Sequence, residues 1–165
     1  MSLNLKGKRF LVTGAGRGIG RELVRALYKE ECRCKEDIEA DRPGSFVNVS
    51  SVLSHVAFPG QGPYCFTKAA LDMITKQFAL ELGQHNIRVN SINPTLVLTE
   101  NIKKFIEEVS PVDKLFTLRA PCDRLPEVTE VVVPIMYLLS DMSSMVSGTN
   151  QVVDGGMLSC FITHL

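Results

Sequence analysis

Apolar and polar positions alternate along the chain in two ways, one typical of strands and one typical of helices. Runs rich in β-branched residues and bounded by turn residues predict buried strands at 7–13, 44–49 and 147–153. Apolar residues at helical spacing predict helices that begin near Gly20 and near Tyr64, and a third over 126–140. Pro134 lies inside this third helix and predicts a kink. Ser51 therefore follows a strand, and Tyr64 stands at the start of a helix.

Tyr64 and Lys68 stand four residues apart, which places them on one face of the predicted helix. A free tyrosine has a pKa near ~10, and an ammonium about 4 Å away would lower that pKa by up to roughly three pH units. Lys68 would then make Tyr64 a usable acid or base at neutral pH. The hydroxyl of Ser51, at the mouth of the strand, would hold a substrate carbonyl oxygen. The alternative is an ordinary helix pair beside an ordinary strand end.

A glycine-rich turn, from Thr13 to Gly20, lies between a predicted strand and a predicted helix. Gly14, Gly18 and Gly20 would let the backbone approach a pyrophosphate, whose charge the N-terminal amides of the helix would meet. The strand before the turn and the helix after it favour phosphate binding over a purely structural turn. Arg17 would reach a further phosphate, which favours NADP over NAD, although a solvated arginine fits the pattern nearly as well.

The composition predicts one domain that binds neither nucleic acid nor a membrane. The 165 residues are 45% hydrophobic, which is enough to fill one core. Lys plus Arg equals Asp plus Glu at 18 each, so no basic surplus indicates nucleic acid. No apolar run reaches the roughly 18 residues that a membrane span needs. Five cysteines without a secretory signal predict reduced thiols in the cytoplasm, and three scattered histidines predict no metal site.

Together, the two motifs resemble the short-chain dehydrogenase/reductase family. The family's cofactor turn is matched by Thr13-Gly14-x-x-x-Gly18-x-Gly20, and its catalytic set by Ser51, Tyr64 and Lys68, with 13 positions from serine to tyrosine. Residues 86–94 are similar to the strand that follows the catalytic helix. Within the family, the sequences of 47–51, 79–83 and 93–99 most resemble those of dicarbonyl/L-xylulose reductases, which are tetrameric NADPH-dependent carbonyl reductases.

The resemblance implies an α/β fold with a Rossmann-like, doubly wound parallel sheet. It also implies hydride transfer from NADP(H) to a small carbonyl compound, such as a dicarbonyl or a ketose. Tyr64 would protonate the carbonyl oxygen, Lys68 would bind the nicotinamide ribose, and Ser51 would orient the substrate. The helix at 100–109, with Phe105 and Leu115 as pocket walls, would cover the substrate. The residues implied in cofactor binding are Gly14, Arg17, Gly18, Ile19, Gly20, Tyr64, Lys68, Asn93, Val97 and Thr99.

The single domain, 1–165, departs from the family between about 31 and 43. Here the first helix runs directly into the strand at 44–49. The family's second to fourth strands and their helices have no counterpart, so the sheet is expected to be abbreviated. In the family, this block carries the residue that recognises the adenosine ribose and a helix asparagine that completes the proton relay of the active site. Both are absent from this chain. A slot between 10–12 and 44–49 would stay empty and leave backbone groups unpaired.

Two functions remain open at this point. The first is an NADP(H)-dependent reductase of small carbonyl compounds, assembled as a homo-oligomer through apolar residues of 69–82. The second is a catalytically weak or inactive derivative of the same family. That derivative would keep Ser51, Tyr64 and Lys68 but would act only through subunit contacts.

Overall fold

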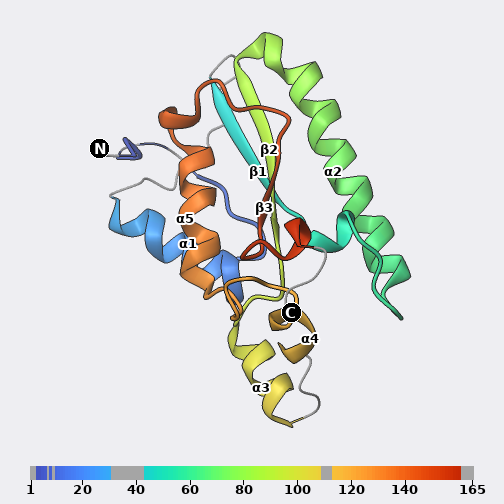
Figure 1. Cartoon of the computed structure of the whole chain (residues 1–165). Helices are drawn as coiled ribbons and strands as arrows, with labels where there is room; N and C mark the ends of the chain where they lie inside the picture. The colour runs from blue at the N-terminus through green and yellow to red at the C-terminus, as the bar shows by residue number, and fades with distance from the viewer. Residues whose placement is uncertain (1–2, 7, 9, 31–42, 109–112, 161–165) are drawn as a thin grey trace.

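A parallel sheet of three strands forms the centre of the computed structural model, which describes residues 3–160 apart from 7, 9, 31–42 and 109–112 (Figure 1). The strands are β1 (Gly44–Val49), β2 (Ile87–Pro94) and β3 (Asn150–Val153), in the order β1-β2-β3. The central strand β2 is buried from Val89 to Pro94, because strands and helices enclose it. The predicted α/β fold with an abbreviated parallel sheet is confirmed. The segment 31–42, where the missing block was placed, lies outside the described residues.

Helices cover both faces of the sheet (Figure 1). On one face, α1 (Gly18–Lys29) packs against α5 (Val128–Leu139). On the other face lies α2 (Gly62–Leu82), without a second helix beside it among the described elements. The shorter helices α3 (Glu100–Glu108) and α4 (Asp113–Thr117) lie beyond the carboxyl ends of β1 and β2. Single turns of 3-10 helix are η1 (Val52–Ser54), η2 (Gly83–His85), η3 (Asp141–Ser143) and η4 (Met157–Ser159).

The main apolar core lies between β2 and the helix pair α1 and α5. Leu23 and Leu27 belong to the predicted apolar stripe of α1 and are buried there, with Ile19 packed against them. The other buried members are Leu5, Ile92, Val97, Val131, Val132, Ile135 and Met136. Pro134 lies inside α5, which nevertheless continues from Val128 to Leu139, so the proline does not divide the helix. This core holds α1 against α5.

The strand predicted at 7–13 is absent from the described sheet, which corrects the sequence-based expectation. Phe10 and Val12 pack against the core, whereas Leu11 between them is 87% exposed. The segment therefore has the alternation of a strand but makes no sheet pairing among the described residues. The physical reason is the empty slot, because among the described strands β1 pairs only with β2 and has no neighbouring strand at its other edge.

Arg88, near the start of β2, ties the sheet to the end of α5. Its Nη1 donates to the carbonyl oxygen of Leu138 at 2.8 Å and to Ser143 Oγ at 2.8 Å. Its Nη2 donates to the carbonyl oxygen of Ser140 at 2.9 Å. Carbonyl groups at the end of a helix have no partner within the helix, so this guanidinium adds a charged donor to the Ser45 and Ser143 hydroxyls that also donate to them. Burial lowers the pKa of Arg88, and electrostatic interactions with Asp141 and Tyr137 partly offset this decrease.

Replacing Arg88 by methionine should therefore lower the free energy of unfolding by about 2 to 4 kcal/mol, since several partly buried acceptors lose a charged donor. Urea denaturation followed by circular dichroism measures this loss. Arg119→Met is the matched control, because Arg119 is exposed. If the two variants unfold at the same urea concentration, the prediction that Arg88 stabilises the fold is wrong.

Candidate active site

A cleft of about 440 Å³ lies at the carboxyl ends of β1 and β2. In parallel α/β sheets this edge is where ligands bind, since loops and helix N-termini converge there. The cleft is bounded by the end of β1, the first turns of α2, the segment after β2, and helices α3 and α4. Its lining residues are Ile19, Val49, Ser50, Ser51, Val52, Leu53, Phe58, Gln61, Tyr64, Lys68, Pro94, Thr95, Leu96, Val97, Ile102, Phe105 and Phe116.

Ser51 follows β1 and begins the turn η1. Its backbone is extended, and its Oγ accepts a hydrogen bond from the backbone N–H of Leu53 at 3.2 Å. Because Oγ acts as an acceptor in that bond, its own O–H remains available to donate. The residue is 8% exposed and lines the cleft. Ser51 therefore lies where the sequence predicted it, at the mouth of a strand.

Tyr64 and Lys68 occupy the first two turns of α2. The helix begins at Gly62 with Pro63 in its first turn, a position where a missing N–H costs nothing. Lys68 Nζ lies 5.5 Å from the centroid of the Tyr64 ring. The same Nζ donates to the carbonyl oxygen of Val49 at 2.8 Å, which fixes the ammonium between α2 and the end of β1. Tyr64 is 43% exposed, so its ring is open to the cleft and to solvent.

Two opposing effects act on Lys68. Burial lowers the pKa of its ammonium, and the negative charge of Asp72, one turn further along α2, raises that pKa. The net direction is downward, so burial is the larger effect. The environment that buries the amine thus also supplies a carboxylate that favours its charged form.

The glycine-rich turn packs too closely for a side chain at one of its positions, Gly20. A Cβ on Gly20 would lie 2.5 Å from the carbonyl oxygen of Gly14, which is closer than any real contact. Gly14 and Gly18 adopt φ of 68° and 57°, in the left-handed region that favours glycine. Arg17 is exposed at the N-cap of α1. Ile19, two residues later, lines the cleft together with the catalytic candidates, whereas Gly14, Arg17, Gly18 and Gly20 are not among its lining residues.

The segment after β2 contributes Val97 and Thr99 in different ways. Val97 lines the cleft, as predicted for a contact with a ligand. Thr99 lies behind the glycine-rich turn, because its Cγ2 is 3.4 Å from the position of a Cβ on Gly18. Its Oγ1 also accepts a hydrogen bond from the N–H of Ile102 at 3.4 Å, in the first turn of α3. Thr99 therefore joins the turn to α3.

Asn93 does not occupy the position that the sequence predicted. Its side chain is 0% exposed and is absent from the lining of the cleft. Its Nδ2 donates to the carbonyl oxygen of Ser51 at 3.2 Å and to Asp72 Oδ2 at 2.8 Å. Asn93 thus supports Ser51 from inside the protein, and a direct contact with cofactor or substrate does not fit this placement.

Aromatic side chains form the wall of the cleft opposite the catalytic candidates. Phe58 and Phe116 stack with ring centroids 5.6 Å apart and planes inclined by 16°. Phe105 lines the cleft as predicted, but Leu115 does not, and its neighbour Phe116 takes that place. Gln61, just before α2, adds a polar group that sequence reasoning missed. A helical assignment of 113–117 would have separated Leu115 from Phe116, since neighbouring residues point to different sides of a helix.

The described residues contain no group of three or more His, Cys, Asp or Glu that could hold a metal ion. None of the helices that the structure describes is long and apolar enough to cross a bilayer.

Comparison with known proteins identifies relatives of the chain. A family profile described as enoyl-(acyl carrier protein) reductase matches residues 32–158. "Carbonyl reductase [NADPH] 2" of Sus scrofa is 48% identical over 122 residues, which cover 74% of this chain and 50% of the relative. "L-xylulose reductase" of Homo sapiens is 44% identical over 118 residues, which cover 72% and 48%. The matched part of the chain thus spans about half the length of these curated relatives.

A relative aligned along its whole length shows the shortening directly. "L-xylulose reductase" of Bos taurus is 44% identical over an alignment of 244 residues, which covers 96% of this chain and 100% of the relative. The chain has 165 residues, so at least 79 of the 244 aligned positions have no counterpart in it.

Solved structures agree with this fold. A short-chain type dehydrogenase/reductase from Mycobacterium ulcerans shares 36% identity at a TM-score of 0.67, covering 71% of this chain and 42% of that one. A gluconate 5-dehydrogenase from Burkholderia cenocepacia, crystallised with NADP and tartrate, shares only 20% identity. It superposes at a TM-score of 0.84 over 96% of this chain and 98% of that one, which is a likeness of fold. The family profile, the curated relatives and the three-layer fold agree, and the chain belongs to the short-chain dehydrogenase/reductase family of oxidoreductases.

Proposed function

We propose that the chain is an NADP(H)-dependent reductase of small carbonyl compounds, with dicarbonyls and ketoses such as L-xylulose as the substrate class. One observation carries this proposal. Ser51, Tyr64 and Lys68 line the same cleft as Ile19, which belongs to the glycine-rich segment. Relatives named carbonyl reductase and L-xylulose reductase support the substrate class.

The glycine-rich turn fits the pyrophosphate of a dinucleotide. The close approach of Gly20 to Gly14 leaves bare backbone at the N-terminus of α1, a helix of 12 residues. Backbone amides at such an end attract phosphate oxygens. The exposed side chain of Arg17, beside the turn, would meet a further phosphate, which favours NADP(H) over NAD(H). Lys68 and Val97 lie deeper in the cleft, where they would hold the nicotinamide end.

The reduced nicotinamide, when bound, supplies the hydride that adds to the carbonyl carbon. The O–H of Ser51 donates a hydrogen bond to the carbonyl oxygen and so holds it in place, because the oxygen of that hydroxyl already accepts from Leu53. The phenolic O–H of Tyr64 transfers its proton to the same oxygen and completes the alcohol. Water then returns a proton to Tyr64, whose ring is 43% exposed.

Lys68 has two tasks in this scheme. One of its three N–H groups binds the carbonyl oxygen of Val49 and anchors the ammonium at the end of β1. The other N–H groups remain to bind a ribose hydroxyl, while the positive charge stays close to the Tyr64 ring. The anchor holds the amine at the edge of the cleft.

The alternative is a derivative of the family with little or no turnover that acts only through subunit contacts. The abbreviated sheet favours it, because β1 is an edge strand in the described structure and the adenosine side of the cofactor site has no strands behind it. The cytoplasm is the proposed location for either function. Cys65, Cys122 and Cys160 are free thiols, which suits a reducing compartment.

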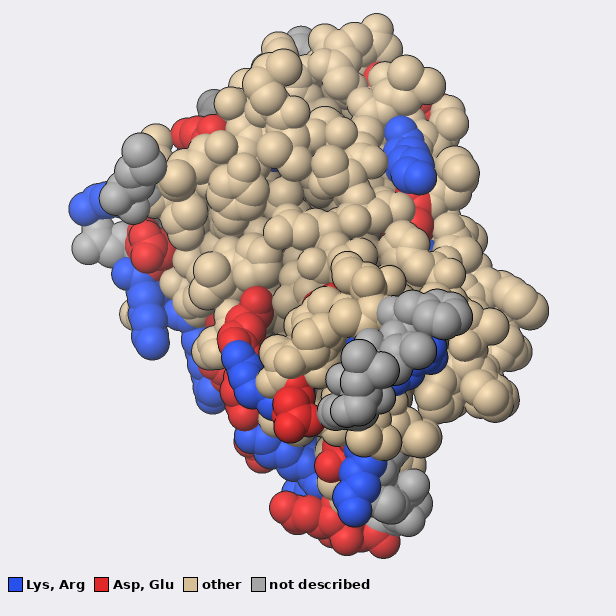
Figure 2. All heavy atoms as spheres, in the orientation of Figure 1, with Lys and Arg blue, Asp and Glu red and all other residues tan. Residues whose placement is uncertain are grey.

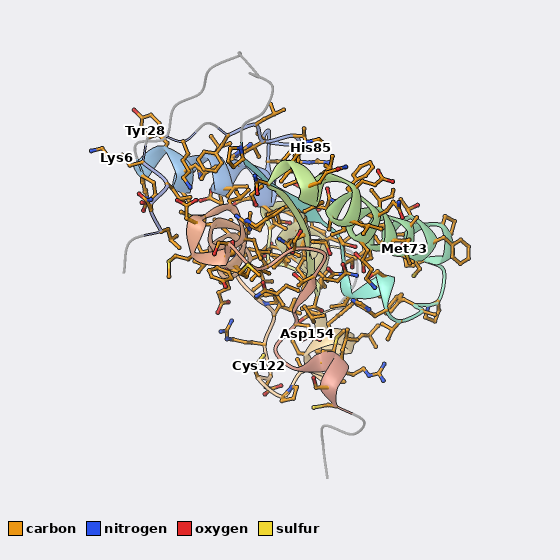
Figure 3. All side chains as sticks on the ribbon, turned by 90° about the horizontal axis from the view of Figure 1, so that it is seen from above. Lys6, Tyr28, Met73, His85, Cys122 and Asp154 are labelled. Carbon is orange, nitrogen blue, oxygen red and sulfur yellow. The ribbon has the colours of Figure 1, made fainter. Side chains whose placement is uncertain are left out.

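Both functions include a homo-oligomer, and α2 supplies a surface for it. The outer side of this helix bears large exposed apolar residues, among them Phe66 (74% exposed), Met73 (62%) and Leu80 (77%). With Ala70 and Gln77 they recur every three or four residues, which is the spacing that packs one helix against another. Figure 2 shows few charges along the α2 side, whereas charged side chains gather around α3, and Figure 3 shows Met73 on the side away from α1.

The apolar seam of α2 is self-complementary. In an antiparallel pairing of two copies centred on Met73, Phe66 of one helix would face Leu80 of the other. A two-fold axis always places the same patch against itself, so such a pairing closes as a dimer. No segment or helix of the described chain covers this side of α2 (Figure 1).

Cofactor binding is the first test of the proposed reductase. Protein fluorescence titrated with NADPH should give saturable binding, and Gly20→Ala should weaken it at least about 10-fold, since the new Cβ displaces the turn that meets the phosphates. Gly83→Ala is the matched control, because a Cβ there meets nothing within 4 Å. Absence of binding by the unmodified chain would refute the reductase and leave the non-catalytic alternative.

Loss of the Tyr64 hydroxyl should separate chemistry from binding. Tyr64→Phe should lower the rate of diacetyl reduction by about 10² to 10⁴-fold, because the proton donor is removed, while NADPH affinity changes little. Tyr28→Phe serves as the control, since Tyr28 lies exposed on α1. A Tyr64→Phe protein that retains full turnover would assign the activity to another site.

A charge in the middle of the α2 seam should dissociate the oligomer. Met73→Glu should convert the assembly to monomers, because two buried like charges would face each other across the two-fold axis. Size-exclusion chromatography with light scattering gives the mass directly. Val133→Glu, at an exposed position on α5, should leave the assembly intact. An unmodified chain that is monomeric at all accessible concentrations contradicts this surface.

A further inference from the structure

The face of α2 that meets the sheet is polar at its centre. Asp72 is 6% exposed and Thr75 is 0% exposed, although such helix positions normally hold apolar residues. An ionised carboxylate is costly to bury unless it is paired and hydrogen-bonded. Thr75 Oγ1 has its partners in Asn48 Nδ2 at 3.0 Å and the carbonyl oxygen of Leu71 at 2.9 Å. The carboxylate of Asp72 is therefore the group that needs an explanation.

One arm of the Asp72 environment leads to Ser51. Asp72 Oδ2 accepts from Asn93 Nδ2 at 2.8 Å, and Asp72 Oδ1 accepts from Ser91 Oγ at 3.3 Å. The same Nδ2 lies 3.2 Å from the carbonyl oxygen of Ser51 and 2.9 Å from Ser54 Oγ, so its second N–H is shared between these two acceptors. Asn93 thus connects the carboxylate on α2 to both ends of the turn that carries Ser51.

The other arm leads to Lys68. Asp72 follows Lys68 by four residues, so the two side chains lie on one face of α2. The negative charge of Asp72 raises the pKa of Lys68 against the effect of burial. Among the described residues, a further titratable group that faces Asp72 is His55 in the turn after η1, whose Nε2 lies 3.7 Å from Asp72 Oδ2. The side chains that β2 presents to Asp72, Ser91 and Asn93, are neutral.

We propose that Asp72 is a positioning residue that joins the serine and lysine arms of the site. Through Asn93 it holds the turn 51–54 in place, and through its charge it favours the protonated form of Lys68. Its meaning for catalysis rests on the proposed reductase function. The two physical effects do not, because both operate in the protein without cofactor or substrate.

The charge effect is tested by titrating Lys68 itself. In protein with ¹³C-methylated lysines, NMR against pH gives the pKa of each amine, and the Lys68→Arg variant identifies the Lys68 signal. Asp72→Asn keeps the size of the side chain and one acceptor oxygen for Asn93 but removes its charge, so the pKa of Lys68 should fall by about one pH unit. Glu81→Gln, an exposed change on the same helix, should leave that pKa where it is. An unchanged Lys68 pKa in Asp72→Asn overturns the charge effect.

The anchoring effect is tested by amide hydrogen exchange. The N–H groups of Leu53, Ser54 and His55 bond within the turn, to Ser51 Oγ, Ser51 O and Val52 O. Asp72→Ala removes the acceptor that holds Asn93, so these three amides should exchange at least about 10-fold faster, as local opening becomes easier. Amides in α5 should exchange at their original rate. Unchanged exchange at 53–55 overturns the anchoring effect.

Asn93→Ser provides the second variant if Asp72→Ala does not fold. Shortening this side chain breaks the link between Asp72 and Ser51 but leaves the carboxylate in place. Exchange at 53–55 should therefore rise as in Asp72→Ala, while the pKa of Lys68 falls much less than in Asp72→Asn. The opposite pattern would contradict the proposed division between the two arms. A chain that binds no NADPH but shows both effects would refute the reductase and support the role of Asp72.

Discussion

The site depends on the register between β1 and β2. Val49 pairs with Ile92, and the N–H of Ser50 donates to the carbonyl oxygen of Ile92 at 2.8 Å. This pairing sets the turn that begins at Ser51 beside Asn93 and within reach of α2. A slip by one residue would turn every side chain of β1 to the opposite face. Lys68, Asp72 and the turn after β1 could then not share their present contacts, so the sheet pairing is the constraint on which the remaining geometry rests.

Local patterns in the sequence predicted the parts of the site that are themselves local. Tyr64 and Lys68 are four residues apart on one helix, and the glycine-rich turn is a continuous segment, so spacing alone identified both. Asp72 and Asn93 lie 21 residues apart and meet only across the packing of α2 on β2. A polar residue in an apolar helix has no visible partner until that packing is known. The hydrogen bonds between Asp72 and Asn93 therefore could not be predicted from spacing. Asn93, which was predicted to contact cofactor or substrate, lies inside the protein.

The strand predicted at 7–13 shows the opposite limit. Its alternation of apolar residues is genuine, because Phe10 and Val12 face the core and Leu11 faces out. A strand also needs a neighbour, and the described sheet offers none at the position where the longer relatives continue. The apolar pattern thus decided which side chains are buried, while the missing block decided whether the backbone could pair. Family resemblance located the block, and only the structure showed how the remaining strands are arranged without it.

The open side of β1 has a consequence for the behaviour of the chain outside its active site. The backbone N–H groups of Gly44 and Ser50 donate to carbonyl oxygens in and next to β2. Because the backbone groups of successive strand residues point to alternate edges, those of Ser45, Val47 and Val49 face the open edge of β1. Phe46 and Val49 on this strand are 56% and 38% exposed, and the six residues of β1 include no charge and no proline. Natural edge strands usually carry a charged residue or a proline, which discourages strands of other molecules from pairing with them. Wherever this edge is uncovered, crowded chains will tend to add strand to strand and leave solution as aggregates, and cellular quality control will then limit how much of the protein persists.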